Sequence, residues 1–332
     1  MSQRSLAGHD VNAIGLGCMN LSHAYGNPLS EKEGIKLIQN AFDLGVNHFD
    51  TAILYGFGSN ESLVGKAVKP FRNDILLASK CGLTTPELTR KVDGRPEAIK
   101  RACEGSLQRL QTDVIDLYYL HRWDKSVPIE ESVGALKALV QEGKIKNIGL
   151  SEVSAQTLRL AHSVHPIAAV QTEYSLWTRN PEINILDTCK ALGTAFVAFS
   201  PLGRGALTGT LQSPANFLEK DLRNNMPRFQ EPNLAKNLAL LENCRDLANQ
   251  ANCSMSQLAL AWLLHTDENL NVIPGTTRIE HLRENCLAAN VKLDADLIVK
   301  IENIINQNTV HGSRYNEKTQ LEIDTEEFSE TT

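Results

Sequence analysis

Short apolar runs alternate with amphipathic helical patterns along almost the whole chain, and this alternation limits the possible folds more than any other feature. Most intervals between the runs are long enough for one helix to cross over to the next parallel strand. The runs are apolar without interruption, which is typical of parallel strands with both faces buried. We expect eight strands, at residues 13–19, 48–50, 75–79, 115–120, 148–150, 168–171, 196–199 and 271–273.

Eight strand–helix units predict an α/β protein whose strands close into a (β/α)8 TIM barrel. The alternative is an open doubly wound sheet, whose first strand would run into the pattern G-x-G-x-x-G. Here Gly15 and Gly17 are followed by Asn20 at the position of the third glycine. The segment also lies too early to open a helix, so we prefer the barrel.

The length of 332 residues suits one barrel domain with additions. We expect a single domain over 1–332, with the barrel at about 10–290 and a C-terminal helix and tail at about 291–332. A segment rich in Gly, Pro, Asn and Arg at 203–232 follows the seventh strand. We interpret it as a lid-like insertion, and a passive surface loop is the alternative. The last dozen residues are expected to be mobile.

Composition and charge exclude several classes of protein. The 33 Lys and Arg against 39 Asp and Glu give a formal charge of −6, which argues against a general nucleic-acid binder. Seven scattered cysteines without a C-x-x-C pair indicate reduced thiols and a cytoplasmic location. No apolar run is long enough to span a bilayer, so we expect no membrane partner. His162 and His165 lack further ligands, so we expect no metal site.

Four ionisable residues lie at or just after the ends of neighbouring strands, where the reactive groups of a TIM barrel are found. Asp50, Lys80 and His121 end the second, third and fourth strands, and Tyr55 follows Asp50 closely. Each has an ordinary structural explanation: a helix cap, a solvated charge, a half-buried histidine or rim packing. Their joint placement at successive strand ends favours a shared site.

These four side chains suit the reduction of a carbonyl group to an alcohol. A tyrosine is a weak acid at neutral pH, and the ammonium of Lys80 would stabilise its phenolate and lower its pKa. Asp50 would hold Lys80, and a neutral His121 would orient the carbonyl oxygen by a hydrogen bond. Such a site has no hydride of its own, so it requires a nicotinamide cofactor.

A series of short motifs runs along the chain in a fixed order, at 50–56, 75–80, 117–122, 149–152, 170–175, 200–203 and 273–278, and at 284–285. Through these motifs the chain resembles the aldo-keto reductases over about residues 10 to 316. Within that superfamily it is most similar to the branch of pyridoxal reductases and perakine-type ketone reductases.

The resemblance implies an NADPH-dependent reductase of small carbonyl compounds, with Tyr55 as general acid and base. It implies that Ser151 and Gln171 bind the nicotinamide carboxamide with Glu152 beside them, and that Phe199 stacks on the nicotinamide ring. The pyrophosphate would lie along Ser200, Pro201, Leu202, Gly203, Arg204 and Gly205. The adenosine end would be held by Gly275, Thr276, Arg278, Glu284 and Asn285.

A departure from the family pattern bears on the choice between NADPH and NADH. Many relatives place a lysine at the position of Gly275, where it meets the 2′-phosphate of the cofactor. Arg278 is the obvious replacement, because a guanidinium can bind a phosphate through two hydrogen bonds. We therefore expect a preference for NADPH.

The substrate pocket is less distinct in the sequence. Its expected walls are Met19, Tyr25, Ile53, Leu54 and Trp123, and a stretch around Arg314 and Tyr315 is expected to close one side. Two other functions remain open at this point. One is a cofactor-sensing regulatory module that resembles the β subunits of potassium channels. The other is a metal-dependent barrel hydrolase, for which too few ligands are apparent.

Overall fold

The computed structural model describes residues 3–84, 90–211, 213 and 217–328. Within them, eight parallel strands form one sheet in the order β12-β11-β10-β9-β8-β5-β4-β3. The edges β12 and β3 meet where the Gly15 amide donates to the Val272 carbonyl at 2.9 Å and the Val272 amide donates to Ala13 at 3.0 Å, which closes the TIM barrel. The strands are β3 (Leu16–Gly17), β4 (His48–Asp50), β5 (Leu76–Cys81), β8 (Ile115–Leu120), β9 (Ile145–Ser151), β10 (Ala169–Glu173), β11 (Ala195–Phe199) and β12 (Leu270–Ile273).

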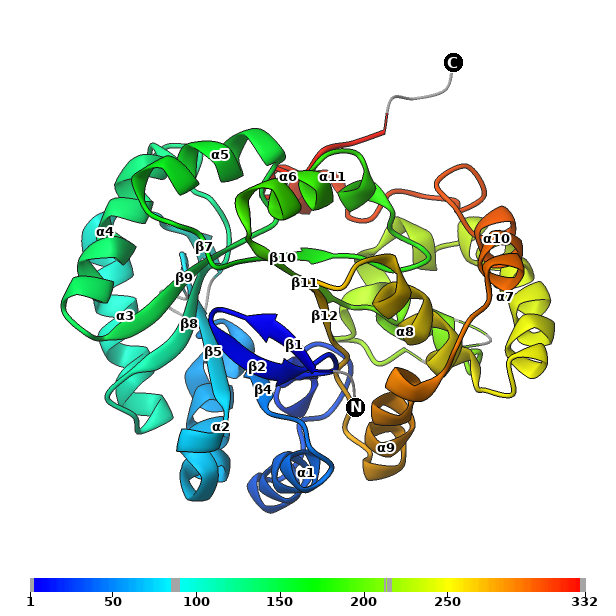
Figure 1. Ribbon diagram of the computed structural model, residues 1–332, viewed down its shortest axis with the longest axis horizontal. Coiled ribbons are helices and arrows are strands. Elements are labelled where there is room, and N and C mark those ends of the chain that lie inside the picture. The colour runs from blue at the N-terminus through cyan, green and yellow to red at the C-terminus, as the bar shows by residue number, and fades with distance from the viewer. Residues whose placement is uncertain (1–2, 85–89, 212, 214–216, 329–332) are drawn as a thin grey trace.

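Helices surround the barrel in Figure 1, and each barrel strand is followed along the chain by at least one of them. Local sequence explains several of their starts: Ser30 and Glu33 form a capping box at α1, as do Ser254 and Gln257 at α8. The helices are α1 (Glu31–Asp43), α2 (Ser59–Val68), α3 (Pro96–Leu110), α4 (Ile129–Gln141), α5 (Ala155–Val164), α6 (Ile185–Leu192), α7 (Asn233–Gln250), α8 (Met255–Thr266), α9 (Ile279–Leu287), α10 (Ala295–Ile304) and α11 (Glu317–Gln320). No helix in the described part of the chain is long and apolar enough to cross a membrane.

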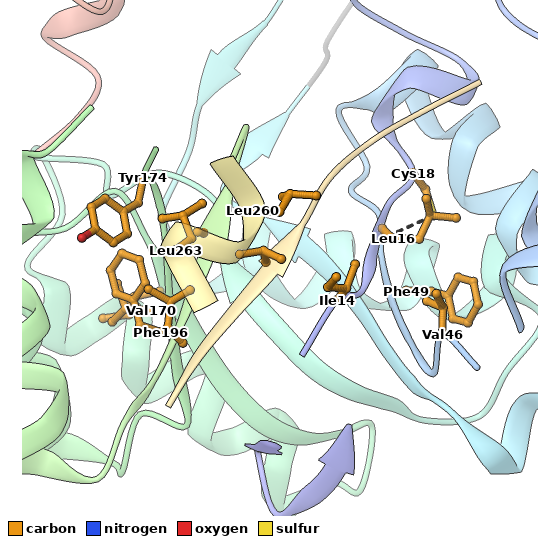
Figure 2. Packing of buried hydrophobic residues seen from close by; sticks show 14 of the residues in the cluster. Ile14, Leu16, Cys18, Val46, Phe49, Val170, Tyr174, Phe196, Leu260 and Leu263 are labelled. Carbon is orange, nitrogen blue, oxygen red and sulfur yellow. Dashed lines mark hydrogen bonds between the residues drawn. The ribbon is translucent and has the colours of Figure 1, made fainter. Parts of the chain in front are cut away.

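The strands divide their side chains between two apolar clusters. Outward-facing residues pack against the helices, as Val170 and Phe196 do beside Leu260 and Leu263 of α8 in Figure 2. Inward-facing residues fill the barrel and include Leu76, Ala78, Leu117, Tyr119, Ala169 and Val197. Because side chains alternate along a strand, the residue two positions after each of these inward-facing residues also points into the barrel.

A short hairpin, which the sequence reading did not predict, closes the amino-terminal end of the barrel. Its strands β1 (Gln3–Leu6) and β2 (His9–Asn12) are antiparallel and overlie the middle of the barrel in Figure 1. Leu6 and Val11 are buried and join the inward-facing cluster. The hairpin therefore supplies the barrel interior with apolar side chains that its own short strands do not provide.

Two expectations, a lid-like insertion at 203–232 and a mobile C-terminus, have different outcomes. The segment after β11 contacts the loop after β3, where the Leu222 amide donates to the Ala24 carbonyl at 3.0 Å. Residues 212 and 214–216 lie outside the described residues, and lid motion stays a prediction. The expectation of a mobile C-terminus is wrong for residues 321–328, because Asp324 and Glu326 are hydrogen-bonded to the start of α5. Residues 329–332 lie outside the described residues.

Candidate active site

The alternation of the strands brings the predicted polar residues to one place. Asp50 of β4 and Lys80 of β5 lie at the inward positions nearest the carboxyl ends, and His121 directly follows β8. Lys80 Nζ contacts Asp50 Oδ1 and donates to the Thr51 carbonyl at 2.9 Å and to Tyr55 Oη at 3.3 Å. Asp50 Oδ2 also accepts a hydrogen bond of 2.8 Å from Gln171.

Tyr55 is held in place by the tight loop that follows β4. A 3-10 turn over Tyr55–Gly58 contains Gly56 with a φ of 55°, and a Cβ there would lie 2.3 Å from Ser59 Oγ. Buried Asn60 ties the loop down: its Oδ1 accepts from Thr51 Oγ1 at 2.6 Å, and its Nδ2 donates to the Cys18 carbonyl at 2.9 Å. Asn60 was not predicted, because its role depends on contacts that only the folded loop creates.

His121 faces Tyr55 edge-on, with the ring centroids 5.9 Å apart and the planes at 89°. Only 6% of its surface is exposed. Burial lowers the pKa of His121 well below 6.5, and the positive charges of Arg122, Lys80 and Arg90 lower it further. The imidazole is therefore neutral at pH 7, which suits a hydrogen-bond donor to a carbonyl oxygen.

The pKa of Tyr55 differs from the simple expectation. Burial raises it above the ordinary 10, and the opposing effect of Lys80 is smaller, so the net shift is upward rather than downward. The pKa of Lys80 is raised, because attraction to Asp50 and Tyr55 together outweighs the burial that would lower it. At neutral pH the site thus contains a protonated phenol next to an ammonium group.

A cavity of about 820 Å³ opens above these residues and contains most of the predicted cofactor and substrate positions. Tyr55, Asp50 and His121 line it, together with Met19, Tyr25, Leu54, Ser151, Gln171, Phe199, Ser200, Pro201, Leu202, Arg204, Gly205, Gly275, Thr276, Glu284 and Asn285. The predicted residues that do not line it are Lys80, Ile53, Trp123, Glu152, Gly203 and Arg278.

The residues outside the lining have other contacts or lie at its edge. Glu152 is buried and forms an ion pair of 2.5 Å with Arg314, while Trp123 donates to the Val127 carbonyl at 2.9 Å. Arg278 precedes α9, and 64% of its side chain is exposed. Its Nε lies 3.8 Å from Glu280 Oε2. Its guanidinium is thus available to a ligand that extends out of the cavity.

A buried ion network that sequence reasoning missed joins the C-terminal segment to the strand ends. Arg204 Nη2 donates to Glu173 Oε2 at 2.6 Å and to Tyr315 Oη at 2.9 Å. Arg314 lies between Glu152 and the same Glu173 carboxylate. Although burial opposes the shift, these arginines and Arg228 hold the pKa of Glu173 at about 2. Tyr315 also lines the cavity, as expected of the stretch that closes one side.

Three further arginines, Arg90, Arg122 and Arg223, line the cavity without having been predicted, and Arg223 is paired with Asp221. Arg122 follows His121 directly, and Arg90 precedes the short strand β7 (Lys91–Val92). His121 was expected at the site because it lies at the end of a strand. The same argument applies to the next residue, so the sequence contained the information needed to predict Arg122. Across the described residues, no group of three or more His, Cys, Asp or Glu side chains is arranged to hold a metal ion.

Fold and site together define a TIM-barrel protein with a Tyr–Lys–Asp–His cluster at the carboxyl ends of its strands. The sequence model of the aldo/keto reductase family matches residues 13–306, and the chain belongs to that family. A probable aldo-keto reductase 1 from Glycine max is 46% identical over 315 residues, which cover 93% of this chain and 89% of that protein.

Solved structures of similar proteins share the fold along nearly their whole length. The glycerol dehydrogenase of Gluconobacter oxydans has a TM-score of 0.84 at 29% identity, over 91% of this chain and 94% of that one. An aldo-keto reductase from Klebsiella pneumoniae, solved in complex with NADPH, has a TM-score of 0.72 at 26% identity, over 95% of this chain and 99% of that one.

Proposed function

We propose that this protein reduces aldehydes or ketones to alcohols with NADPH, and that Tyr55 donates the proton. The observation that carries the proposal is the chain of contacts from Asp50 through Lys80 to Tyr55 Oη beneath a cavity that His121 also lines. Carbonyl reduction needs an acid at the oxygen where negative charge develops, and this arrangement supplies one.

Each of the four side chains has a distinct part in the proton transfer. The raised pKa keeps Tyr55 protonated at neutral pH, so a proton is always present to be donated. As the phenolate forms, the adjacent ammonium of Lys80 stabilises its negative charge. Asp50 balances the buried charge of Lys80 and fixes its position. The neutral imidazole of His121 orients the carbonyl oxygen toward Tyr55.

The residues that line the cavity fit an extended dinucleotide. NADPH, when bound, supplies the hydride. Ser151 and Gln171 lie beside the catalytic cluster, where they would hold the carboxamide, and the half-buried Phe199 presents a ring for stacking. Gly275 lines the cavity and packs closely on the loop after β3, since a Cβ there would lie 2.9 Å from Asn20 Oδ1. The exposed Arg278 would meet the 2′-phosphate, which supports NADPH over NADH.

The relatives support this proposal, and their described ligands include NADPH in the Klebsiella pneumoniae enzyme. The resemblance to pyridoxal and perakine-type reductases stays a proposal about substrate, and it justifies including pyridoxal and aromatic ketones in a substrate panel. A cytoplasmic location is also proposed, on the ground that all seven cysteines are free thiols. No observation favours the regulatory-module alternative.

The test is the consumption of NADPH by wild-type protein and by Tyr55→Phe across a panel of aldehydes and ketones. We expect Tyr55→Phe to lower turnover by at least about 100-fold, because the proton donor is removed, while NADPH still binds. Tyr118→Phe is the matched control, because it removes a buried hydroxyl whose partner is Ser106, outside the site. Wild-type turnover in the Tyr55→Phe protein, or a wild-type protein that binds no nicotinamide, would contradict the proposal.

A further inference from the structure

Arg122 is a buried cation at the active site that lacks a carboxylate partner. Only 6% of its surface is exposed, and it lines the cavity next to His121. Its Nη1 donates to the His121 carbonyl at 2.6 Å and to Ser151 Oγ at 3.2 Å. Its Nε has no hydrogen-bond partner, and no carboxylate oxygen of the described residues lies within 4 Å of the guanidinium.

Two other arginines near the cavity have buried side chains that are neutralised by a carboxylate. Arg204 is paired with Glu173, and Arg314 is paired with Glu152. Removing a guanidinium from water without an opposite charge is unfavourable by several kcal/mol. A fold that neutralises two buried arginines but leaves Arg122 unpaired at the reacting centre therefore has an unmet requirement for an anion at that point.

The position of Arg122 in the barrel separates this requirement from the cofactor phosphates. In the closed order of eight strands, β8 is four strands from β12 in either direction, so Arg122 lies across the barrel mouth from Gly275 and Arg278. The predicted pyrophosphate segment follows β11, the neighbour of β12. Arg90, which follows β5 in the chain, adds a second positive charge on the side of Arg122, although it is paired with Glu322.

We propose that Arg122 binds an anionic group, a carboxylate or a phosphate, on the carbonyl substrate itself. This inference rests on the proposed reductase function and names its substrate class. The planar guanidinium matches a carboxylate or phosphate through two parallel hydrogen bonds. Because Arg122 is the residue after His121, one substrate would be held at its anion by Arg122 while its carbonyl group faces His121 and Tyr55.

The experiment compares matched pairs of anionic and neutral substrates. The carboxylate pair is 4-carboxybenzaldehyde and its methyl ester, and the phosphate pair is glyceraldehyde 3-phosphate and glyceraldehyde. Each is assayed with wild-type protein, Arg122→Met, Arg122→Lys and the control Arg101→Met, which removes an exposed arginine of α3. Calorimetry then measures binding of 4-(hydroxymethyl)benzoate and its methyl ester with and without NADP+, so that one readout needs no turnover.

We expect wild-type protein to prefer the anionic member of at least one pair. Arg122→Met should lower kcat/KM for that member by about 10- to 100-fold, chiefly through KM, since a charged hydrogen-bonded contact is lost. The neutral member should fall less than the anionic one, because it shares only the loss of the contacts that Arg122 makes with His121 and Ser151. Arg122→Lys should retain part of the preference because it keeps the charge, and Arg101→Met should match wild type. Whichever pair shows the effect identifies the carboxylate or the phosphate as the anion.

Several results would overturn the inference, and they differ from failure of the reductase function. If Arg122→Met weakens NADPH binding or slows both members of a pair equally, the function of Arg122 is to position Ser151 for the cofactor rather than to bind an anionic substrate. If wild type shows no anion preference in kinetics or calorimetry, there is no such subsite. If wild type reduces no carbonyl compound at all, the reductase proposal fails, and calorimetry alone then decides whether Arg122 binds the carboxylate.

Discussion

At the scale of single residues, the site is a balance between burial and charge. Tyr55 is pushed toward its neutral form by burial and toward its phenolate by Lys80, and burial is the larger effect. His121 is pushed toward its neutral form by burial and by three positive charges. Both groups therefore hold, at neutral pH, the protonation state that carbonyl reduction needs.

This balance predicts the pH dependence of the reaction. In the proposed reaction Tyr55 donates only while it is protonated, and its protonated fraction falls as pH rises through a pKa above 10. His121 is neutral at any pH above its pKa, which lies well below 6.5. We expect kcat/KM for reduction of a neutral aldehyde at saturating NADPH to be flat from about pH 7 to 9 and to decline above about pH 10. A decline centred between pH 7 and 9 would show that a different group is the acid.

At the scale of elements, the C-terminal segment acts as part of the barrel rather than as a free tail. Asp324 Oδ2 accepts hydrogen bonds from the Ser154 amide at 3.0 Å, from Ser154 Oγ at 2.9 Å and from Thr157 Oγ1 at 2.7 Å. These contacts place a carboxylate at the amino end of α5, where it interacts favourably with the helix dipole. The C-terminal part of the chain also brings Tyr315 to the cavity and Arg314 to Glu152.

We expect Asp324→Ala to lower the free energy of unfolding by about 1–2 kcal/mol, because three hydrogen bonds and the charge at the helix end are lost together. Asp74→Ala is the control, since Asp74 is exposed and makes no contact of this kind in the described residues. Urea denaturation of the three proteins measures the difference. Equal midpoints for Asp324→Ala and Asp74→Ala would mean that the C-terminal segment does not stabilise the barrel.

At the scale of the whole molecule, the barrel depends on side chains from outside its own strands. Three residues of β4 and two of β3 leave the amino-terminal end of the barrel short of apolar side chains. Leu6 from the terminal hairpin is fully buried against the inward-facing cluster. Within the barrel, the absence of a side chain at Gly149 of β9 leaves space for the ring of Tyr119, since a Cβ at Gly149 would lie 2.3 Å from that ring.

We expect Leu6→Ala to destabilise the protein by about 2–5 kcal/mol, because it leaves a cavity where the hairpin meets the barrel interior. The matched control is Leu321→Ala, whose side chain is 75% exposed and whose loss should change stability by less than about 0.5 kcal/mol. Guanidinium unfolding followed by circular dichroism reports both. A Leu6→Ala protein as stable as Leu321→Ala would show that the hairpin is not part of the core.

The alternation of apolar runs and helical patterns was enough to predict the strands and, through their ends, the positions of the Asp50, Lys80 and His121 side chains. Asp50, Lys80 and His121 are expected together because the end of each apolar run marks the carboxyl end of a strand, where the reactive groups of a barrel are found. The family resemblance supplied the expected cofactor positions, most of which line the cavity, although Glu152, Gly203 and Arg278 lie outside its lining. The structure brings these residues to one place because a local pattern alone sets their positions, and their roles in catalysis and cofactor binding stay predictions.

The pairing of the buried charges and the place of the two terminal segments in the core became apparent from the three-dimensional contacts. Glu152 forms an ion pair with Arg314, which is distant in sequence, whereas Arg122 forms no ion pair with a carboxylate of the described residues. The hairpin at 3–12 and the anchored residues at 321–328 carry no periodic signal, since their contacts are with distant parts of the chain. The net pKa of Tyr55 likewise follows from burial, a property of the packed molecule that a run of residues does not contain.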